Sequence, residues 1–187
     1  AQLGAMLTDM LITMTDRGPD SAGIAIYSQD TVNIGKMTVQ SDTPDVDFDK
    51  LTGDLKKRIK GDVDIRVQST HAVLALRADQ VVVAREALKE IRPNIRIMST
   101  GDSLEIYKEV GLPKDVASRF DIAKMSGSHG IGHTRMATES AVTTMGAHPF
   151  NTGSDQCLVH NGSLSNHNSL RRKLRRDGVH IETENDT

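Results

Sequence analysis

The sequence predicts one domain that mixes α-helices with β-strands, and three observations lead to this prediction. At 187 residues the chain is long enough for one sizeable core, or for one domain with a small insertion. Apolar residues recur at helical spacing in several segments, and short strand-like apolar runs lie between them. Aromatic residues make up only 3% and Trp is absent, so Leu, Ile, Val, Met and Ala must form the core.

Charge and cysteine content narrow the class of protein. The formal net charge is −2, and the one dense basic cluster, 171–176, lies on an expected helix, where a solvated face explains it better than nucleic acid does. The single cysteine excludes an internal disulfide framework and fits a reducing compartment. No apolar run approaches the roughly 20 residues that span a bilayer, and no signal-peptide pattern is present. We therefore expect a cytoplasmic protein that binds neither nucleic acid nor a membrane.

The chain is expected to open with a helix that leads into a strand. Leu and Met recur at helical spacing from Leu3 to Met14, which predicts an amphipathic helix whose Met-rich face packs on a sheet. The segment 17–21 contains Gly18 and Pro19, which end the helix. A strand over 22–27 follows, and its glycine at position 23 indicates a close approach of another segment.

The middle of the chain is expected to alternate strands with helices. The expected elements are a strand over 32–39, a helix that ends at Gly61, a strand over 71–76, a helix over 81–91 and a hairpin of 95–98 with 104–107. Because the block from about 65 to 108 has its own alternation of strand and helix, we expect it to be a surface insertion.

Two stretches in the last third resemble the edge of a ligand site. Residues 130–138 and 157–162 are each a small-residue or apolar run that ends in polar groups and glycine, a layout that places donors at the end of a strand. A further helix with Leu170 and Leu174 is expected to begin after Asn166 and to end at Gly178.

Arg135 and the pair Asn161-Gly162 carry the candidate chemistry. The planar fork of Arg135 suits a carboxylate, although a surface ion pair explains an arginine equally well. Asn161 offers an amide donor and Gly162 an open backbone N–H, and two such donors on one oxygen stabilise the tetrahedral intermediate of acyl transfer. Asn-Gly is also the commonest type I′ hairpin turn, so the dipeptide alone does not decide between these interpretations.

The remaining reactive side chains have simpler explanations. His129 and His133 are four residues apart, but Gly-Ile-Gly between them disfavours the helix that would bring both onto one metal ion. His148, in Gly-Ala-His-Pro-Phe, could position a loop over a substrate. Cys157 lies within an apolar strand-like run, where a thiol is usually a small buried hydrophobe. Asp186 is most simply an exposed carboxylate.

Five motifs, taken together and in this order, resemble the class II glutamine amidotransferase domain. They are Arg17-Gly18-Pro19-Asp20-Ser21-Ala22-Gly23, Gly132-His133-Thr134-Arg135-Met136-Ala137-Thr138, Ala147-His148-Pro149-Phe150, His160-Asn161-Gly162 and Glu184-Asn185-Asp186-Thr187. The resemblance implies an α+β fold, the four-layer α/β/β/α sandwich of N-terminal-nucleophile hydrolases, truncated here at both ends. The chain looks most like the separate amidotransferase subunits of glutamate-synthase-like systems, including N-methylglutamate synthase.

The resemblance also implies a reaction and a role for each matching residue. The reaction is hydrolysis of glutamine to glutamate and ammonia, with no cofactor and no metal in this chain. Arg135 would bind the α-carboxylate of glutamine and Asp186 its α-ammonium, and Asn161 with the Gly162 amide would form the oxyanion hole. Arg17 would support the surroundings of the nucleophile, and His148 would belong to the loop beside the pocket.

In this family the nucleophile is an N-terminal cysteine, whose α-amino group serves as the general base. Here the sequence starts with Ala1-Gln2-Leu3, so we expect residues 1–187 alone to lack glutaminase activity. The complete form is expected to be an oligomer that delivers ammonia to a synthase partner, a glutamate-synthase-like subunit that could contain flavin. The alternative is a non-catalytic amidotransferase-like module that binds glutamine or partner subunits. A histidine-dependent metallohydrolase is a third and weaker hypothesis.

Overall fold

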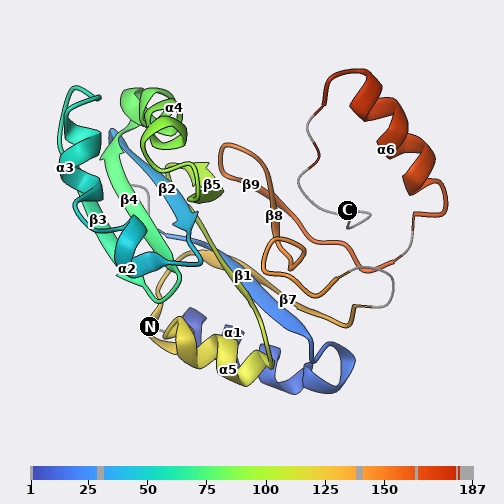
Figure 1. The fold of residues 1–187 in the computed structure, drawn as a ribbon. Helices are drawn as coiled ribbons and strands as arrows, with labels where there is room; N and C mark the ends of the chain where they lie inside the picture. Colours follow the sequence, from blue (N-terminus) through green and yellow to red (C-terminus); the bar gives the residue numbers. More distant parts are fainter. Residues whose placement is uncertain (1, 29–31, 138–140, 163, 180, 182–187) are drawn as a thin grey trace.

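The structure is a computed structural model that describes residues 2–28, 32–137, 141–162, 164–179 and 181. Its described strands form three sheets, and every pair of neighbouring strands within them is antiparallel. Helices pack against the two larger sheets (Figure 1). The predicted mixture of helices and strands is confirmed, and the fold is consistent with the α+β class.

Sheet A has three strands and contains the strand with the buried glycine. Strand β1 (Ser21–Tyr27) lies in its centre, between β6 (Leu104–Val110) and β7 (His129–Arg135). All residues of β1 except Tyr27 are buried, as expected for a strand that is paired on both edges and covered on both faces. The register sets Gly23 opposite Lys108 on one side and His133 on the other.

Helices α1 (Gln2–Thr13) and α5 (Pro113–Arg119) cover one face of sheet A. Leu7 and Leu11, one helical turn apart, are buried against β7, where Gly130 and Gly132 leave room for them. The expected packing of the Met-rich face is wrong. Met6 and Met10 are 59% and 63% exposed, because the adjacent leucine stripe faces the sheet instead.

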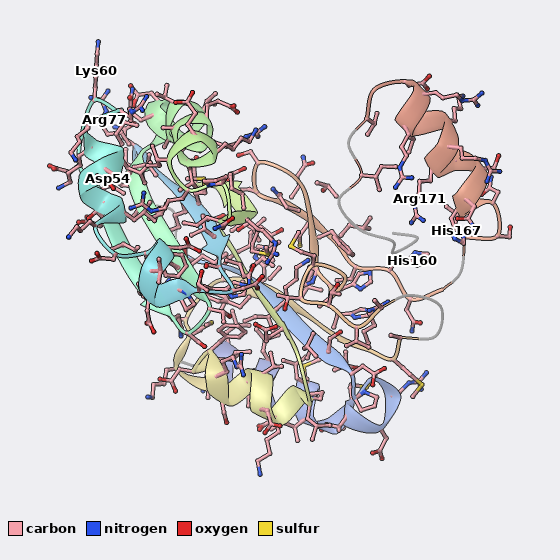
Figure 2. The ribbon with its side chains drawn as sticks, viewed as in Figure 1. Asp54, Lys60, Arg77, His160, His167 and Arg171 are labelled. Atoms are coloured by element: carbon pink, nitrogen blue, oxygen red, sulfur yellow. The ribbon has the colours of Figure 1, made fainter. Side chains whose placement is uncertain are left out.

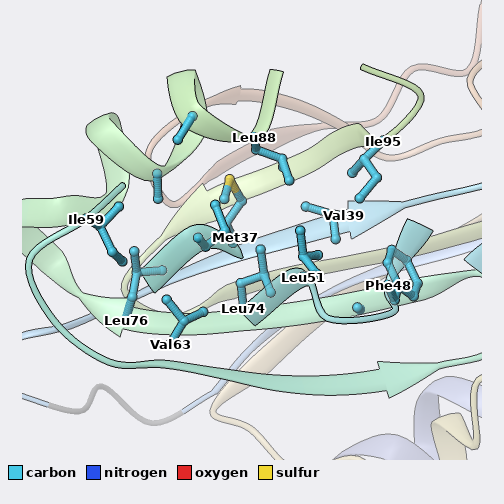
Figure 3. Close-up of a cluster of buried hydrophobic side chains, with 14 residues drawn as sticks. Met37, Val39, Phe48, Leu51, Ile59, Val63, Leu74, Leu76, Leu88 and Ile95 are labelled. Atoms are coloured by element: carbon cyan, nitrogen blue, oxygen red, sulfur yellow. The ribbon is translucent and has the colours of Figure 1, made fainter. Parts of the chain in front are cut away.

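Sheet B has four strands and carries the largest apolar core. Its order is β3–β4–β2–β5, and helices α3 and α4 cover one of its faces, where 14 buried side chains form one cluster (Figure 3). Met37, Leu74 and Leu88 are at the centre of this cluster and no more than 1% exposed. The elements are β2 (Ile34–Gln40), α2 (Pro44–Asp47), α3 (Leu51–Lys56), β3 (Val63–Gln68), β4 (His71–Arg77) and α4 (Val81–Ile91), with β5 (Arg96–Gly101) at one edge.

The block 65–108 is part of both sheets. Strand β4 pairs with β2, and β6 pairs with β1, so residues of the block are bonded to strands outside it. The expected hairpin is wrong in its pairing, because β5 joins β2 of sheet B while β6 joins β1 of sheet A. The carboxylate of Asp155 holds the turn between them by accepting from the backbone N–H groups of Asp102, Ser103 and Leu104 at 2.8–2.9 Å.

The last third of the chain adds a small hairpin and a basic helix. Among the described strands, β8 (Phe150–Gly153) and β9 (Gln156–Leu158) pair only with each other, and helix α6 (His167–Arg176) has no buried residue. The helix ends before Gly178, which has a φ of +83° and supplies the expected stop. Short 3-10 turns follow α1 (η1, Thr15–Arg17), β4 (η2, Ala78–Gln80) and α5 (η3, Ile122–Lys124).

None of the helices in the described ranges has both the length and the apolar content that crossing a bilayer requires.

A fully buried histidine lies between the two larger sheets. His71 on β4 packs edge-on against the ring of Phe120, with ring centroids 4.8 Å apart, and its Nδ1 contacts the Thr70 hydroxyl at 3.1 Å. Burial, and then the charges of Lys108 and Arg119, lower the pKa of His71 to about 3. The folded protein therefore keeps this imidazole neutral well below its ordinary pKa of 6.5.

The variant His71→Gln tests this burial. As pH falls below 6.5, His71 becomes protonated in the unfolded chain. In the folded chain it stays neutral until about pH 3. The contribution of neutral His71 to the free energy of unfolding is therefore complete above pH 6.5. Below pH 6.5 it declines by up to about 1.4 kcal/mol per pH unit. Urea denaturation should show that the free energy of unfolding falls less steeply with decreasing pH in His71→Gln. The core variant Val39→Ala should lower it equally at every pH, and an unchanged slope in His71→Gln would contradict the prediction.

Candidate functional site

The candidate site lies at the end of β7 where the strand leaves sheet A. His133 and Arg135 are two residues apart on this strand, so both side chains point to the same face of the sheet. That face also carries Gly23 of β1 and Lys108 of β6, since Lys108, Gly23 and His133 lie opposite one another across the three strands. Three strands therefore contribute to one row of residues.

Gly23 allows the loop that contains His148 to lie directly on the sheet. A Cβ atom at this position would be 2.3 Å from the carbonyl oxygen of His148 and 2.5 Å from Cβ of Lys108, closer than atoms can approach. Only glycine fits here without moving one of these neighbours. The predicted close approach at position 23 is confirmed, and the approaching segment is the motif Ala147-His148-Pro149-Phe150.

Lys108, on β6, holds this loop against sheet A. Its side chain is buried, and its ammonium group donates to the carbonyl oxygens of Ala147 at 2.7 Å, Pro149 at 3.1 Å and Met145 at 3.3 Å. The ammonium also lies 4.3 Å from the centre of the Phe150 ring, a cation–π contact. A buried charge is tolerated only when its donors are satisfied, and here backbone carbonyls of one loop satisfy them.

Two histidine rings pack together above this row. The rings of His133 and His148 are 4.4 Å apart, and Nε2 of His133 contacts the carbonyl oxygen of His160 at 3.1 Å. Burial, and then the nearby charges of groups that include His133, Lys108 and Arg135, lower the pKa of His148 to about 3. Burial also lowers the pKa of His133. Both rings are therefore neutral at physiological pH, and His133 links β7 to the segment that contains Asn161.

Arg135 lies where three of the sequence motifs meet. Its carbonyl oxygen accepts from the backbone N–H of Asp20 at 3.1 Å, and the Asp20 carboxylate accepts from the backbone N–H of Ala137 at 2.8 Å. A Cβ atom at Gly146 would lie 3.6 Å from a guanidinium nitrogen of Arg135, so the side chain extends toward the loop before His148. Arg135 is half-buried as a residue, and its guanidinium nitrogen Nη1 is buried.

Asn161 and Gly162 lie at the open side of this region. Both are exposed, and Asn161 helps to line a pocket of about 160 Å³ together with His133, Met10 and Met14. A Cβ atom at Gly162 would be 2.8 Å from Nε2 of His160, so a side chain here would meet that imidazole. Figure 2 labels His160 on the same side of the molecule as His167 and Arg171 of α6.

The other expected site residues are placed less closely. Arg17 ends the turn η1, which contacts β7, but it is exposed and no contact of its side chain with Arg135 or His148 is recorded among the described residues. Asp186 lies outside the described residues. Cys157 is half-buried on β9, and its sulfur contacts the Tyr27 hydroxyl at 3.4 Å. Burial, then this contact, raise the pKa of Tyr27 to about 12, so the sulfur faces a protonated phenol.

Lys108 is the residue that sequence reasoning missed. Its signal is the alternation of β6, in which Leu104, Ile106 and Lys108 share one face of the strand. A lysine in line with two buried aliphatic residues indicates a buried charge with a specific set of acceptors. The acceptors themselves lie about 40 residues further along the chain, and no local pattern points to them.

Within the described part of the chain, no three His, Cys, Asp or Glu side chains gather in a way that could hold a metal ion. The histidines near β7 instead pack on one another and on backbone carbonyls.

The variant Lys108→Met tests whether this ammonium holds the loop. Methionine keeps the apolar stem but leaves buried carbonyl oxygens without their donor, which should lower the free energy of unfolding by about 2–4 kcal/mol. Amide hydrogen exchange in residues 144–150 should become faster while exchange in the core of sheet B does not. The control Lys114→Met changes an exposed lysine on α5 and should leave both measurements as in the parent. Unchanged exchange in the loop of Lys108→Met would contradict this role.

Comparison with known proteins agrees with the motifs. Residues 121–187 match the model of the glutamine amidotransferase domain. The chain is 64% identical over 186 residues to the glutamine amidotransferase-like protein GlxB of Rhizobium meliloti (strain 1021), which covers 100% of this chain and 62% of that protein. It is 40% identical over 91 residues to a glutamine–fructose-6-phosphate aminotransferase (isomerizing) of Methanosarcina mazei, which covers 46% of this chain and 14% of that protein.

The chain thus spans less than two thirds of the length of these relatives. The matched region 121–187 contains Arg135, His148, Asn161, Gly162 and Asp186, five of the six site residues that the motifs predict. Residues 121–187 are similar to a glutamine amidotransferase domain, and the chain as a whole is similar to a protein named as glutamine amidotransferase-like.

Proposed function

We propose that this chain forms the glutamine-binding part of a class II glutamine amidotransferase, which hydrolyses glutamine to glutamate and ammonia. The observation that carries the proposal is the grouping of Arg135, the His148 loop and Asn161 around the end of β7, within the region that matches the amidotransferase domain. These residues come from three of the five motifs, and His133 contacts both of the other segments.

Arg135 would bind the α-carboxylate of glutamine. It is half-buried at a strand end, with its backbone held by Asp20, so the guanidinium begins from a fixed position. A paired, charge-assisted contact of this kind is stronger than a neutral hydrogen bond. Asp186 would bind the α-ammonium, and Arg17 would support the surroundings of the nucleophile; both roles rest on the family resemblance alone.

Asn161 and the amide of Gly162 would stabilise the oxyanion. The side chain of Asn161 is exposed beside a pocket, where it can donate to a bound substrate. His148 would form the side of the pocket, and Lys108 would hold it there.

The fold and the partners belong to the same proposal. Helices α1 and α5 against sheet A, with α3 and α4 against sheet B, suit the α/β/β/α sandwich of N-terminal-nucleophile hydrolases. We propose that the chain is one domain of the type 2 glutamine amidotransferase class, with an α/β insertion at about 65–108 whose strands join both sheets, and that it assembles as an oligomer. The ammonia would pass to a synthase partner of the glutamate-synthase-like type, a subunit that could contain flavin.

A non-catalytic glutamine-binding module is the second candidate. One observation favours it: the only thiol among the 187 residues, Cys157, lies on β9 and contacts the Tyr27 hydroxyl at 3.4 Å. A half-buried thiol that contacts a protonated phenol, with no cation beside it in the contacts above, lacks the electropositive setting that activates a cysteine. Binding of glutamine by the full-length protein without release of glutamate would favour the module, and release of glutamate would favour the enzyme.

The variant Arg135→Lys tests the carboxylate contact. Lysine keeps the charge but loses the planar fork, so the affinity for glutamine should fall by about 10- to 100-fold, as expected for charged hydrogen bonds worth 1.5–3 kcal/mol. Calorimetric titration of the full-length protein with glutamine measures this. The matched control Arg85→Lys changes an exposed arginine on α4 and should bind as the parent does. Equal affinity in Arg135→Lys would rule out this role.

The variant Asn161→Ala separates catalysis from binding. Loss of one oxyanion donor should reduce kcat for glutamate release by about 10²- to 10³-fold while the dissociation constant for glutamine changes little. Initial rates and calorimetry on the full-length protein give the two values. The control Asn94→Ala, at an exposed turn, should keep the parent rate. A full rate in Asn161→Ala would mean that Asn161 is not an oxyanion donor.

A further inference from the structure

A second pocket lies at the other end of sheet A. It has a volume of about 340 Å³, within the range of small-molecule sites, and is lined mainly by polar and charged residues. Its walls come from β1, β3 and β6 and from the segment that follows α5. The lining residues are Ile26, Ser28, Arg66, Gln68, Glu105, Asp121, Lys124, Met125 and Ser126.

This pocket is separate from the candidate amidotransferase site. Ser21 of β1 is opposite Arg135, whereas Ile26 and Ser28, at the other end of the strand, line the pocket. A rise of about 3.3 Å per residue puts these two ends of β1 roughly 20 Å apart. A ligand in the pocket would therefore not touch Arg135.

Arg66 is held in the pocket by a buried carboxylate. A guanidinium nitrogen of Arg66 donates to Oε2 of Glu105 at 2.6 Å, and another donates to the Gln68 side chain at 2.9 Å. Glu105 is buried and also accepts from Lys36 at 3.0 Å and Tyr107 at 2.7 Å. Burial alone would raise the pKa of Glu105, but these partners hold it below its usual range.

This arrangement leaves positive charge at the pocket. Lys36 and Arg66 both pair with the one carboxylate of Glu105, so the trio has a formal charge of +1. The side chain of Arg66 is 53% exposed, and its guanidinium has five N–H donors, of which Glu105 and Gln68 take one each and Tyr107 interacts with the group as well. A fixed guanidinium with an open edge is suited to a carboxylate or a phosphate.

Lys124 is a second cation that could close over such an anion. It pairs with Asp121 at 2.8 Å, but both side chains are exposed and three residues apart, so water and salt screen the pair and it is weak. Exchange of Asp121 for a ligand anion would therefore cost little. The hydroxyl groups of Ser28 and Ser126 also line the pocket and can donate or accept.

We propose that this pocket binds a small molecule with a phosphate or carboxylate group, held by Arg66 and covered by Lys124. The anion would lie against the open edge of the guanidinium, with Lys124 on the solvent side. The remaining volume would take the rest of a small metabolite. This proposal does not depend on glutamine hydrolysis, because the two sites share no residue.

Calorimetric titration of the full-length protein with inorganic phosphate, and separately with malonate, tests the proposal at matched ionic strength. Saturable binding of either probe is expected. Arg66→Gln should weaken it by about ten-fold or more, because charged hydrogen bonds are lost, and Lys124→Gln by about three-fold. The matched control Lys114→Gln, on the exposed side of α5, should bind as the parent does.

The two probes distinguish a phosphate ligand from a carboxylate ligand. The two variants are both needed because one of them, Arg66→Gln, could lose binding simply by misfolding. Binding of phosphate alone would indicate a phosphate-bearing ligand, binding of malonate alone a carboxylate, and both outcomes support the site. Arg66→Gln could destabilise the fold by removing a partner of Glu105, so circular dichroism must accompany it, while Lys124→Gln changes only exposed atoms. Binding of neither probe, or binding that Lys124→Gln and folded Arg66→Gln leave unchanged, would overturn the proposal.

Discussion

The buried ammonium group of Lys108 is the interaction on which the candidate site depends. It converts three carbonyl oxygens of one loop into the acceptors of a single charge, so the loop can occupy only one position on sheet A. Gly23 permits that position by offering no side chain, and the His148 ring then meets His133. The loop brings few aliphatic side chains to the sheet, and its placement is determined mainly by charge and by close backbone contact.

The sequence predicted most elements, because helical spacing and alternation survive in single segments. It could not choose between two neighbouring stripes of α1. Leu3, Leu7 and Leu11 form one stripe, and Met6 and Met10 lie close beside it on the helix, so both fit the same period. The leucine stripe faces the sheet because Gly130 and Gly132, more than 120 residues away, make room for it there. Local sequence patterns likewise could not predict which sheet β5 and β6 would join, because the strands with which they pair are distant in sequence.

The sequence predicted the positions of those site residues that lie at the end of a strand or just after it. Arg135 was expected at a strand end and ends β7. Asn161 was expected after a strand and follows β9, which is shorter than expected and pairs only with β8 among the described strands. The contact between His133 and His160 could not be predicted, because it joins two motifs through a ring nitrogen and a backbone oxygen. The same is true of Asp155, a hairpin carboxylate that collects three backbone N–H groups of another turn.

The position of β1 in sheet A also determines when this protein can fold during its synthesis. Its two partner strands end at Val110 and Arg135. Both edges of β1 can therefore be paired along their whole length only after Arg135, 114 residues after Ser21, has been synthesised. At ribosomal rates of 5–20 residues per second, synthesis of these 114 residues takes roughly 6–23 s. Throughout it, a strand of Ala, Ile and Tyr has open edges, although sheet B can pair β2 with β4 much earlier. Nascent chains of this protein therefore have a long interval in which β1 is open to chaperones.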